Sequence, residues 1–466
     1  MSFDLVIRGG TLVTPDGVRP GALGVRDGRL AAVAGPDTDL EAPETWDATG
    51  LHVLPGAIDI HCHIRSPAYP ERGTVESETI ACAAGGITTV FEMPITDPCC
   101  NSPERVAIRR AHFAAHARVD FALYAAPAEL TRPAFEALAD AGVVALKIFT
   151  IPAPVGREHE FEGLAWPHLT DQLQALKLAA EVGLPVVVHA EHPEVLARSA
   201  SRAARLDPAL ATTHEVARPA LAESLAVAQL LTLNMEARAQ LHIAHVTSIA
   251  TLNVLRRFAG SSDFTAETCP QYLRHTSDDV ARVGVFGKVN PPIRTAEDRE
   301  ALWSALSDGT LGHVTTDHTS FSFEEKSAHA GNFLTAPPGH PGTELLLPTL
   351  LSGVADGRLT LPQVAELTSG AAARRFRLPD RGTLGEGARA HLAVVDLDGE
   401  TRPTADNLQT AARDLARLAH GQTYRGRVAA PFVAGRPVWD GSAVDAPPGW
   451  GRFVRPGRRH SRESGS

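Results

Sequence analysis

Eight short runs of apolar and β-branched residues recur between residues 56 and 318, and longer stretches of helical composition separate them. The runs read GAIDIHCHI, GITTVFEMP, VDFALYAA, VVALKIFT, LPVVVHAE, LHIAHVTS, DFTAETC and GHVTTDH. Such runs are typical of parallel strands that are buried on both faces. Their alternation with helices predicts an α/β fold, either a closed (β/α)8 TIM barrel or a doubly wound open sheet. We favour the barrel because a ring of strands would bring together the polar residues that end several runs.

Both ends of the chain show a different pattern, in which Asp-Gly and Gly-Gly pairs separate short β-branched runs. This is the chemistry of β-hairpins. We predict a small β-sandwich domain built from residues 1–54 and 385–445, beside a catalytic barrel of residues 55–384. Residues 446–466 form an Arg-rich tail whose end we expect to be disordered, with Trp450 and Phe453 as anchors on the body or on a partner subunit.

Composition excludes several classes of function. A net charge of −10 argues against nucleic acid or an anionic membrane as a partner. No apolar run reaches the roughly 20 residues that span a bilayer, and the N-terminus lacks a secretory signal pattern. The five cysteines show no CxxC spacing. We therefore expect a cytoplasmic protein with reduced thiols and no membrane partner.

Polar residues stand at the carboxyl ends of five runs, where the active site of a barrel lies. Because a strand has a period of two residues, His61 and His63 point the same way and Cys62 points the other. Imidazole and carboxylate groups that converge in this way suit a divalent metal ion. The candidate ligands are His61, His63, Lys147, His189, His245 and Asp317.

Each of these residues has an alternative interpretation when taken alone. A histidine at a strand end can be a hydrogen-bonded residue of the core or rim, and Asp317 could cap the segment that follows it. Lys147 is harder to explain, because burial disfavours a charged ammonium. The chain contains only four lysines. The convergence of all six residues on one barrel end favours a metal site.

The constellation resembles the amidohydrolase superfamily, and within it the cyclic amidohydrolases: dihydroorotase, allantoinase and hydantoinase or dihydropyrimidinase. The resemblance covers nearly the whole chain and includes the motifs PGAIDIHCHIR, AAGGITTVFEMP, LKIF, VVVHAE, IAHVTS, ETCPQYL, NPPIR and TTDHTSFSFEEK. It implies that the six residues bind two divalent metal ions, by default Zn²⁺, and that Lys147 is an N6-carboxylysine bridging them. His242 matches no ligand, and we expect it to have a supporting or structural role.

The resemblance also implies a reaction. A hydroxide bridging the two metals attacks a cyclic amide, and Asp317 passes its proton to the leaving nitrogen. The substrate would be a small cyclic amide, and we expect a homo-oligomer, either a dimer or a tetramer. A non-catalytic scaffold relative is the alternative from another class, but the full set of metal ligands argues against it.

The identity of the ring is left open by the sequence. Arg65 matches an arginine that reads the substrate carboxylate in dihydroorotases, whereas Ile95 and Phe321 stand where that family has polar readers. Asn290 and His340 are further candidates for substrate binding. We expect a ring of the dihydroorotase or allantoinase type, with strict dihydroorotase activity in doubt. The alternative is a hydantoinase or dihydropyrimidinase, in which Ile95 and Phe321 would line an apolar pocket for a ring substituent.

Overall fold

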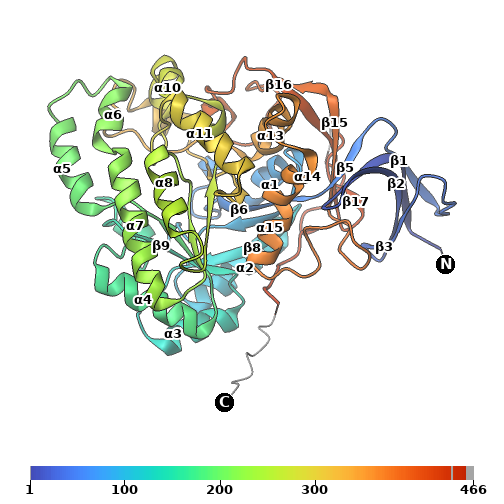
Figure 1. The fold of residues 1–466 in the computed structure, drawn as a ribbon, viewed down its shortest axis with the longest axis horizontal. Coiled ribbons are helices and arrows are strands. Elements are labelled where there is room, and N and C mark those ends of the chain that lie inside the picture. The colour runs from blue at the N-terminus through green and yellow to red at the C-terminus, as the bar shows by residue number, and fades with distance from the viewer. Residues whose placement is uncertain (1, 442–443, 458–466) are drawn as a thin grey trace.

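The computed structural model describes residues 2–441 and 444–457 (Figure 1). Parallel strands follow one another around a ring in chain order. They are β6 (Ala57–His63), β7 (Ile87–Glu92), β8 (Asp120–Ala125), β9 (Ala145–Phe149), β10 (Val186–His189), β11 (Leu241–Ile243), β12 (Phe264–Thr268), β13 (His313–Val314) and β14 (His318–Thr319).

The eighth strand closes the ring in two short pieces. β13 pairs with β12, and β14 pairs with β6, the first strand. Only residues 315–317 separate the two pieces, so one stretch of chain contacts both neighbours. The prediction of an α/β barrel is confirmed, and Asp317 lies at the break in this strand.

Helices cover the outside of the ring and bury the apolar faces of the strands. The longer helices are α1 (Val75–Ala84), α2 (Pro103–His116), α3 (Arg132–Ala141), α4 (Leu169–Val182), α5 (Pro193–Ala203), α7 (Ala220–Ala237), α8 (Ile249–Phe258), α11 (Ala296–Ser307) and α13 (Leu346–Ala355). The shorter ones are α6 (Ala211–Ala217), α9 (Pro270–Arg274), α10 (Ser277–Val283), α12 (Phe323–Ser327), α14 (Leu361–Ala365) and α15 (Ala371–Arg375). Gly142 and Gly183 end α3 and α4 with left-handed φ angles of 88° and 75°. Glycine adopts this conformation without a Cβ clash, so the chain can turn directly into the next strand.

Strands from both ends of the chain pair in a second sheet beside the barrel (Figure 1). Its members are β1 (Leu5–Thr14), β2 (Gly17–Arg26), β3 (Arg29–Ala34), β4 (Glu44–Asp47), β5 (His52–Pro55), β15 (Leu392–Thr401), β16 (Tyr424–Val433) and β17 (Arg436–Pro437). β5 pairs with β1 on one side and with β15 on the other, which joins the two ends of the chain. The sheet has its own apolar core, which includes Leu23, Val53 and Phe432.

The segment after this sheet returns to the barrel. The backbone N–H groups of Phe121 and Val454 donate to the carbonyls of Arg452 and Phe121 at 3.0 and 2.8 Å. The rings of Phe121 and Phe453 lie 5.7 Å apart, and the Trp450 indole donates to the Val433 carbonyl at 3.0 Å. Trp450 and Phe453 therefore anchor the segment on the body of the same chain. The predicted disorder of the tail's end concerns residues outside the described part.

One stretch, Ala211–Ala237, is long and apolar enough to cross a membrane by length and composition alone. The expectation that no apolar run reaches this length was therefore wrong for this stretch. In the fold the stretch is divided into α6 and α7, with Pro219 between them. The longer part, α7, packs against α4 and α8 on the outside of the barrel. Its composition is that of a helix covering a sheet.

Candidate metal centre

The six residues predicted as metal ligands come to one end of the barrel. His61 and His63 lie on β6, Lys147 on β9, and His189 ends β10, while His245 and Asp317 follow β11 and β13. All six line one cavity. His245 and Asp317 have left-handed φ angles of 37° and 45°. Such angles are uncommon for residues with a Cβ and are concentrated at functional sites.

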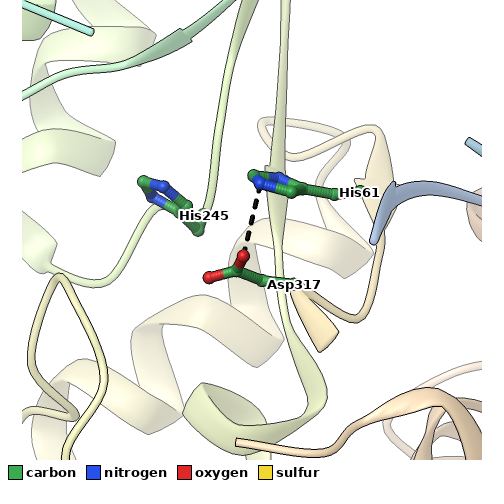
Figure 2. Close-up of side chains that lie close together, drawn as sticks. All are labelled: His61, His245 and Asp317. Atoms are coloured by element: carbon green, nitrogen blue, oxygen red, sulfur yellow. Dashed lines mark ion pairs between the residues drawn. The ribbon is translucent and has the colours of Figure 1, made fainter. Parts of the chain in front are cut away.

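The side chains approach one another closely. Asp317 Oδ1 lies 3.3 Å from Nε2 of His61 and 3.3 Å from Nε2 of His63. His189 Nδ1 lies 2.9 Å from His245 Nε2. Figure 2 shows His61, His245 and Asp317, whose ligand atoms lie within 4.8 Å of one another. This spacing would allow one ion to contact all three side chains.

Two buried glutamates fix the histidine rings. Glu267, on β12, accepts a hydrogen bond from Nδ1 of His61 at 2.5 Å and another from Nε2 of His242 at 2.9 Å. Glu191 accepts a bond from Nε2 of His189 at 2.7 Å. The bonds to His61 and His189 leave the other nitrogen of each ring facing the cavity, as carboxylates do behind metal-binding histidines. The other nitrogen of His242 bonds to Thr265 Oγ1 at 2.7 Å instead. His242 therefore has a supporting place beside Glu267.

Sequence reasoning missed both glutamates as site residues, although they lie in quoted motifs. Glu191 stands two residues after His189 in VVVHAE, the spacing that places both side chains on one side of an extended strand. Glu267 opens the ETCPQYL motif. A buried carboxylate in a barrel strand is itself a signal, since charged residues are seldom fully buried without partners. Arg218 adds a further partner, because its guanidinium bonds to Glu191.

Burial sets the protonation of the cluster. Desolvation lowers the pKa of His61 to about 4, and the Lys147 ammonium adds to this effect. Burial likewise lowers the pKa of His63 and of His245 well below the usual range. Imidazoles with such pKa values are neutral at pH 7 and have a lone pair for a metal ion.

Lys147 is fully buried, and its Nζ lies 3.5 Å from Nε2 of His61. Burial lowers the pKa of this lysine to about 8, although Glu267 and Asp317 favour its charged form. A larger share of the side chain is therefore present as free amine near neutral pH than for an exposed lysine. A free amine is the form that reacts with carbon dioxide.

The donor set fits divalent metal ions. Four neutral imidazoles and a carboxylate supply the N and O donors that Zn²⁺ and similar ions prefer. Burial raises the pKa of Asp317, although the neighbouring His61 and Lys147 favour its charged form. A cation beside the Nε2 atoms of His61 and His63 would stabilise the ionised carboxylate.

The predicted substrate-binding residues lie in three different places. Arg65, Ile95 and Asn290 line the same cavity as the ligands. Phe321 instead lines a neighbouring cavity, which shares Asn290 and several other residues with the first. His340 is buried outside both cavities, 6.5 Å from the ring of His275.

Residues that were not predicted to bind the substrate also line the cavity. Phe149, Ile151 and Phe161 form an apolar side together with Ile95. Arg157 and Arg218 face it from other loops. The site thus combines a polar floor with one apolar and one cationic wall.

Comparison with known proteins shows which family this chain matches. Residues 52–438 match the amidohydrolase family. The chain is 38% identical to an allantoinase of Rubrobacter xylanophilus over 98% of both proteins. It is 31% identical to an L-hydantoinase of Paenarthrobacter aurescens, over 97% of this chain and 98% of that protein.

A solved structure of similar fold agrees with these matches. The L-hydantoinase (dihydropyrimidinase) from Arthrobacter aurescens has a TM-score of 0.91 and 30% identity to this chain, over 97% of this chain and 100% of that chain. Family, relatives and fold agree along nearly the full length. The chain belongs to the amidohydrolase family, and it is a cyclic amidohydrolase.

Proposed function

We propose that this enzyme hydrolyses an amide bond of a hydantoin-type ring, with allantoin as the first candidate substrate. Allantoin and the hydantoins share this five-membered ring, and the relatives named above are an allantoinase and an L-hydantoinase. The observation that carries the proposal is the convergence of six ligand-type residues on the floor of one cavity. Ring opening would give a carboxylate and a ureido group.

Two divalent ions, by default Zn²⁺, would be held by His61, His63, His189, His245 and Asp317, with carboxylated Lys147 between them. Bound divalent cations lower the pKa of a water molecule and polarise an amide carbonyl. Glu267 and Glu191 would keep the histidine rings in the tautomers that face the cavity.

The remaining steps belong to side chains of the chain itself. Asp317, whose Oδ1 lies 3.3 Å from Nε2 of both His61 and His63, would take a proton from the attacking water and deliver it to the leaving ring nitrogen. Asn290 has a buried Oδ1 without a hydrogen-bond partner among the described residues, and it lines the cavity. This amide is suited to accept a hydrogen bond from a ring N–H group and so to orient the ring.

A second candidate function is supported by the apolar wall. Ile95, Phe149 and Phe161 would favour a hydantoin or dihydropyrimidine that carries an apolar substituent. Dihydroorotate, whose ring carries a carboxylate, would bind less well beside Ile95.

We also propose that the enzyme works in the cytoplasm as a homo-oligomer, a dimer or a tetramer, which sedimentation of the pure protein would test.

A substrate panel tests the proposal directly. Purified enzyme loaded with zinc would be given allantoin, unsubstituted hydantoin, 5-isopropylhydantoin, dihydrouracil and dihydroorotate. We expect ring opening to be fastest with a hydantoin-type ring and to cease after chelation and removal of metal. Full activity in metal-free protein, or faster opening of dihydroorotate than of any hydantoin-type ring, would contradict it.

A further inference from the structure

Two buried lysines lie behind the wall of the cavity that faces the candidate ligands. Lys326 has no exposed surface, and Lys288 is 5% exposed. In the described part of the chain neither ammonium forms an ion pair with a carboxylate. Both donate to backbone carbonyls instead. Burial without a counter-charge is costly and lowers the pKa of both lysines to about 7, and the carbonyls serve as their hydrogen-bond acceptors.

Lys326 holds two separate segments of chain. Its Nζ donates to the carbonyls of Phe286 at 3.3 Å and Lys288 at 3.2 Å, and also to the carbonyl of Gly339. The three protons of an ammonium thus have three acceptors. The first two carbonyls belong to the 286–290 segment, and the third belongs to the 334–340 segment.

Lys288 strengthens the same connection from the other side. Its Nζ donates to the carbonyl of Ala336 at 2.5 Å and to that of Leu334 at 3.4 Å. The N–H group of Gly339 donates in return to the Lys288 carbonyl at 3.0 Å. The two segments are therefore joined by bonds in both directions.

These segments supply part of the active-site wall. The 286–290 segment contributes Val289 and Asn290 to the cavity, and the 334–340 segment contributes Pro338 and Gly339. A Cβ on Gly339 would lie 2.8 Å from a methyl group of Thr319, which also lines the cavity, so this residue is closely packed against the end of the eighth strand. A shift of the 286–290 segment would move Asn290 relative to Asp317, and the bonds to the 334–340 segment oppose such a shift.

The helix that carries Lys326 is itself fixed. Ser322 caps α12 by accepting the N–H of Glu325 at 3.1 Å, and the Glu325 carboxylate bonds to Arg72 at 2.7 Å. This helix begins six residues after Asp317. The lysine therefore projects from an element that is tied to the same strand end as the candidate proton carrier.

We propose that Lys326, with Lys288, is a positioning residue that clamps the 286–290 and 334–340 segments and so places Asn290 for binding of the substrate ring. The proposal rests on the proposed function in one respect, namely that this cavity receives the ring. A planar guanidinium cannot point three donors at carbonyls that converge on one small ammonium. This explains the use of lysine in a chain that otherwise relies on arginine.

The test compares Lys326→Met, Lys326→Arg and Lys288→Met in the full-length, zinc-loaded enzyme. Lys177→Met is the matched control, because Lys177 is an exposed lysine that pairs with Glu236. We expect faster hydrogen–deuterium exchange in the 286–290 and 334–340 segments of the three variants. With the hydantoin substrate, KM should rise about tenfold while kcat falls less than about threefold, because loosened segments weaken ring binding. Metal content should be unchanged.

Three outcomes would overturn the clamp. These are unchanged exchange in both segments, an unchanged KM despite faster exchange, and loss of metal, which would place the role of the lysines at the metal centre. Lys288→Met removes two of the bonds and keeps the experiment decisive if Lys326→Met does not fold. A wild-type enzyme that opens no hydantoin ring would contradict the proposed function, whereas the exchange measurement would still decide whether the lysines hold the segments.

Discussion

The guanidinium carbon of Arg65 lies 4.9 Å from the ring centre of Phe321, and that of Arg72 lies equally close to the same ring. Contacts of this kind contribute about 0.5–2 kcal/mol, more when they are shielded from water. Arg65 is 4% exposed, and its Nε and Nη1 atoms have no hydrogen-bond partner among the described residues. Phe321 thus acts on the cavity through Arg65.

Replacing Phe321 by leucine should weaken substrate binding through this contact. Leucine keeps an apolar side chain but has no aromatic face, so Arg65 would lose one support. We expect KM for allantoin to rise about three- to tenfold with a small change in kcat, the equivalent of a cation–π contact. Phe3→Leu is the control, since Phe3 makes a comparable contact with the Arg26 guanidinium, at 5.4 Å, beside the second sheet. Equal kinetics in both variants would show that Phe321 does not position Arg65.

The preference among rings should depend on Ile95. Because Ile95 lines the cavity and cannot pair with a carboxylate, we expect kcat/KM for dihydroorotate to lie below about 10⁴ M⁻¹s⁻¹. Ile95→Asn combined with Phe321→His should improve dihydroorotate turnover, and Ile95→Asn alone should account for most of the gain. Efficient dihydroorotate hydrolysis by the unmodified enzyme would mean that neither residue determines ring choice.

Asp317→Asn should abolish turnover while much of the metal is retained. An amide can still coordinate weakly through its oxygen but cannot accept a proton. The wild-type pH–rate profile should fall on the acidic side, since the carboxylate must be ionised to act as a base. Stopped assays with metal analysis of the same samples test this, with Asp171→Asn on α4 as the control. Near-normal activity would move the proton transfer to another group. The neighbouring His318 is already engaged by Glu78 and by the N–H of Gly342.

A buried carboxylate distant from the metal centre should determine stability at low pH. Burial alone would raise the pKa of Asp120, but His391 and Arg381 outweigh this effect and hold it well below its usual range. Asp120 also accepts the backbone N–H of Arg452 at 2.8 Å, which fixes the C-terminal segment. The stabilisation is complete well above the ordinary pKa of 3.8 and is lost as the pH falls from that value toward the folded-state pKa.

Asp120→Asn should therefore cost about 1.5–3 kcal/mol at pH 7, because it removes a charged acceptor from Arg381 and His391, while Arg381 keeps Asp380 as a partner. The loss should shrink in acid, where the wild-type carboxylate becomes protonated. Thermal unfolding from pH 7 down to pH 3 measures both effects. Asp308→Asn breaks an exposed ion pair with Arg256 and should change the melting temperature little. A pH-independent difference between wild type and Asp120→Asn would contradict the electrostatic account.

The strands of the barrel could be predicted because each is a short apolar run. A strand that is buried on both faces consists mainly of apolar and β-branched residues. The ligand candidates could be found because their positions at strand ends follow from a period of two along the strand. His61 and His63 needed only that rule to be placed side by side. The long-range pairing of β5 with β15 was suggested by similar hairpin composition at both ends of the chain.

The loops were less accessible to sequence reasoning. Phe321 lies four residues after Asp317, yet it faces a neighbouring cavity because the chain turns into the cap of α12 at Ser322. The partners of Lys326 are backbone carbonyls. Every residue type has this group, so the sequence cannot indicate which residues supply it. Glu267 was missed because its partners, His61 and His242, lie on other strands. Glu191 could have been found, since its partner His189 is only two residues away.

Lys147 provides the sharpest test of the metal centre. A structural ion pair would tolerate arginine at this position, whereas a carbamate requires a primary amine that reacts with carbon dioxide. Lys147→Ala and Lys147→Arg should both be inactive and should lose at least one metal ion, because two cations would then face each other without a bridging carboxylate. Lys177→Ala, which alters an exposed lysine, should keep its metal and activity.

Chemical rescue separates the carbamate from other roles of Lys147. A short carboxylic acid such as propionate, added with excess zinc to Lys147→Ala, should occupy the space of the missing side chain and restore a measurable fraction of activity. The same acid should not rescue Lys147→Arg, whose side chain fills that space. Native mass spectrometry of the intact wild type should also show the added mass of carbon dioxide on the chain. An active Lys147→Arg variant, or wild-type protein without this mass, would leave the buried lysine as an ordinary amine and the carbamate hypothesis would fail.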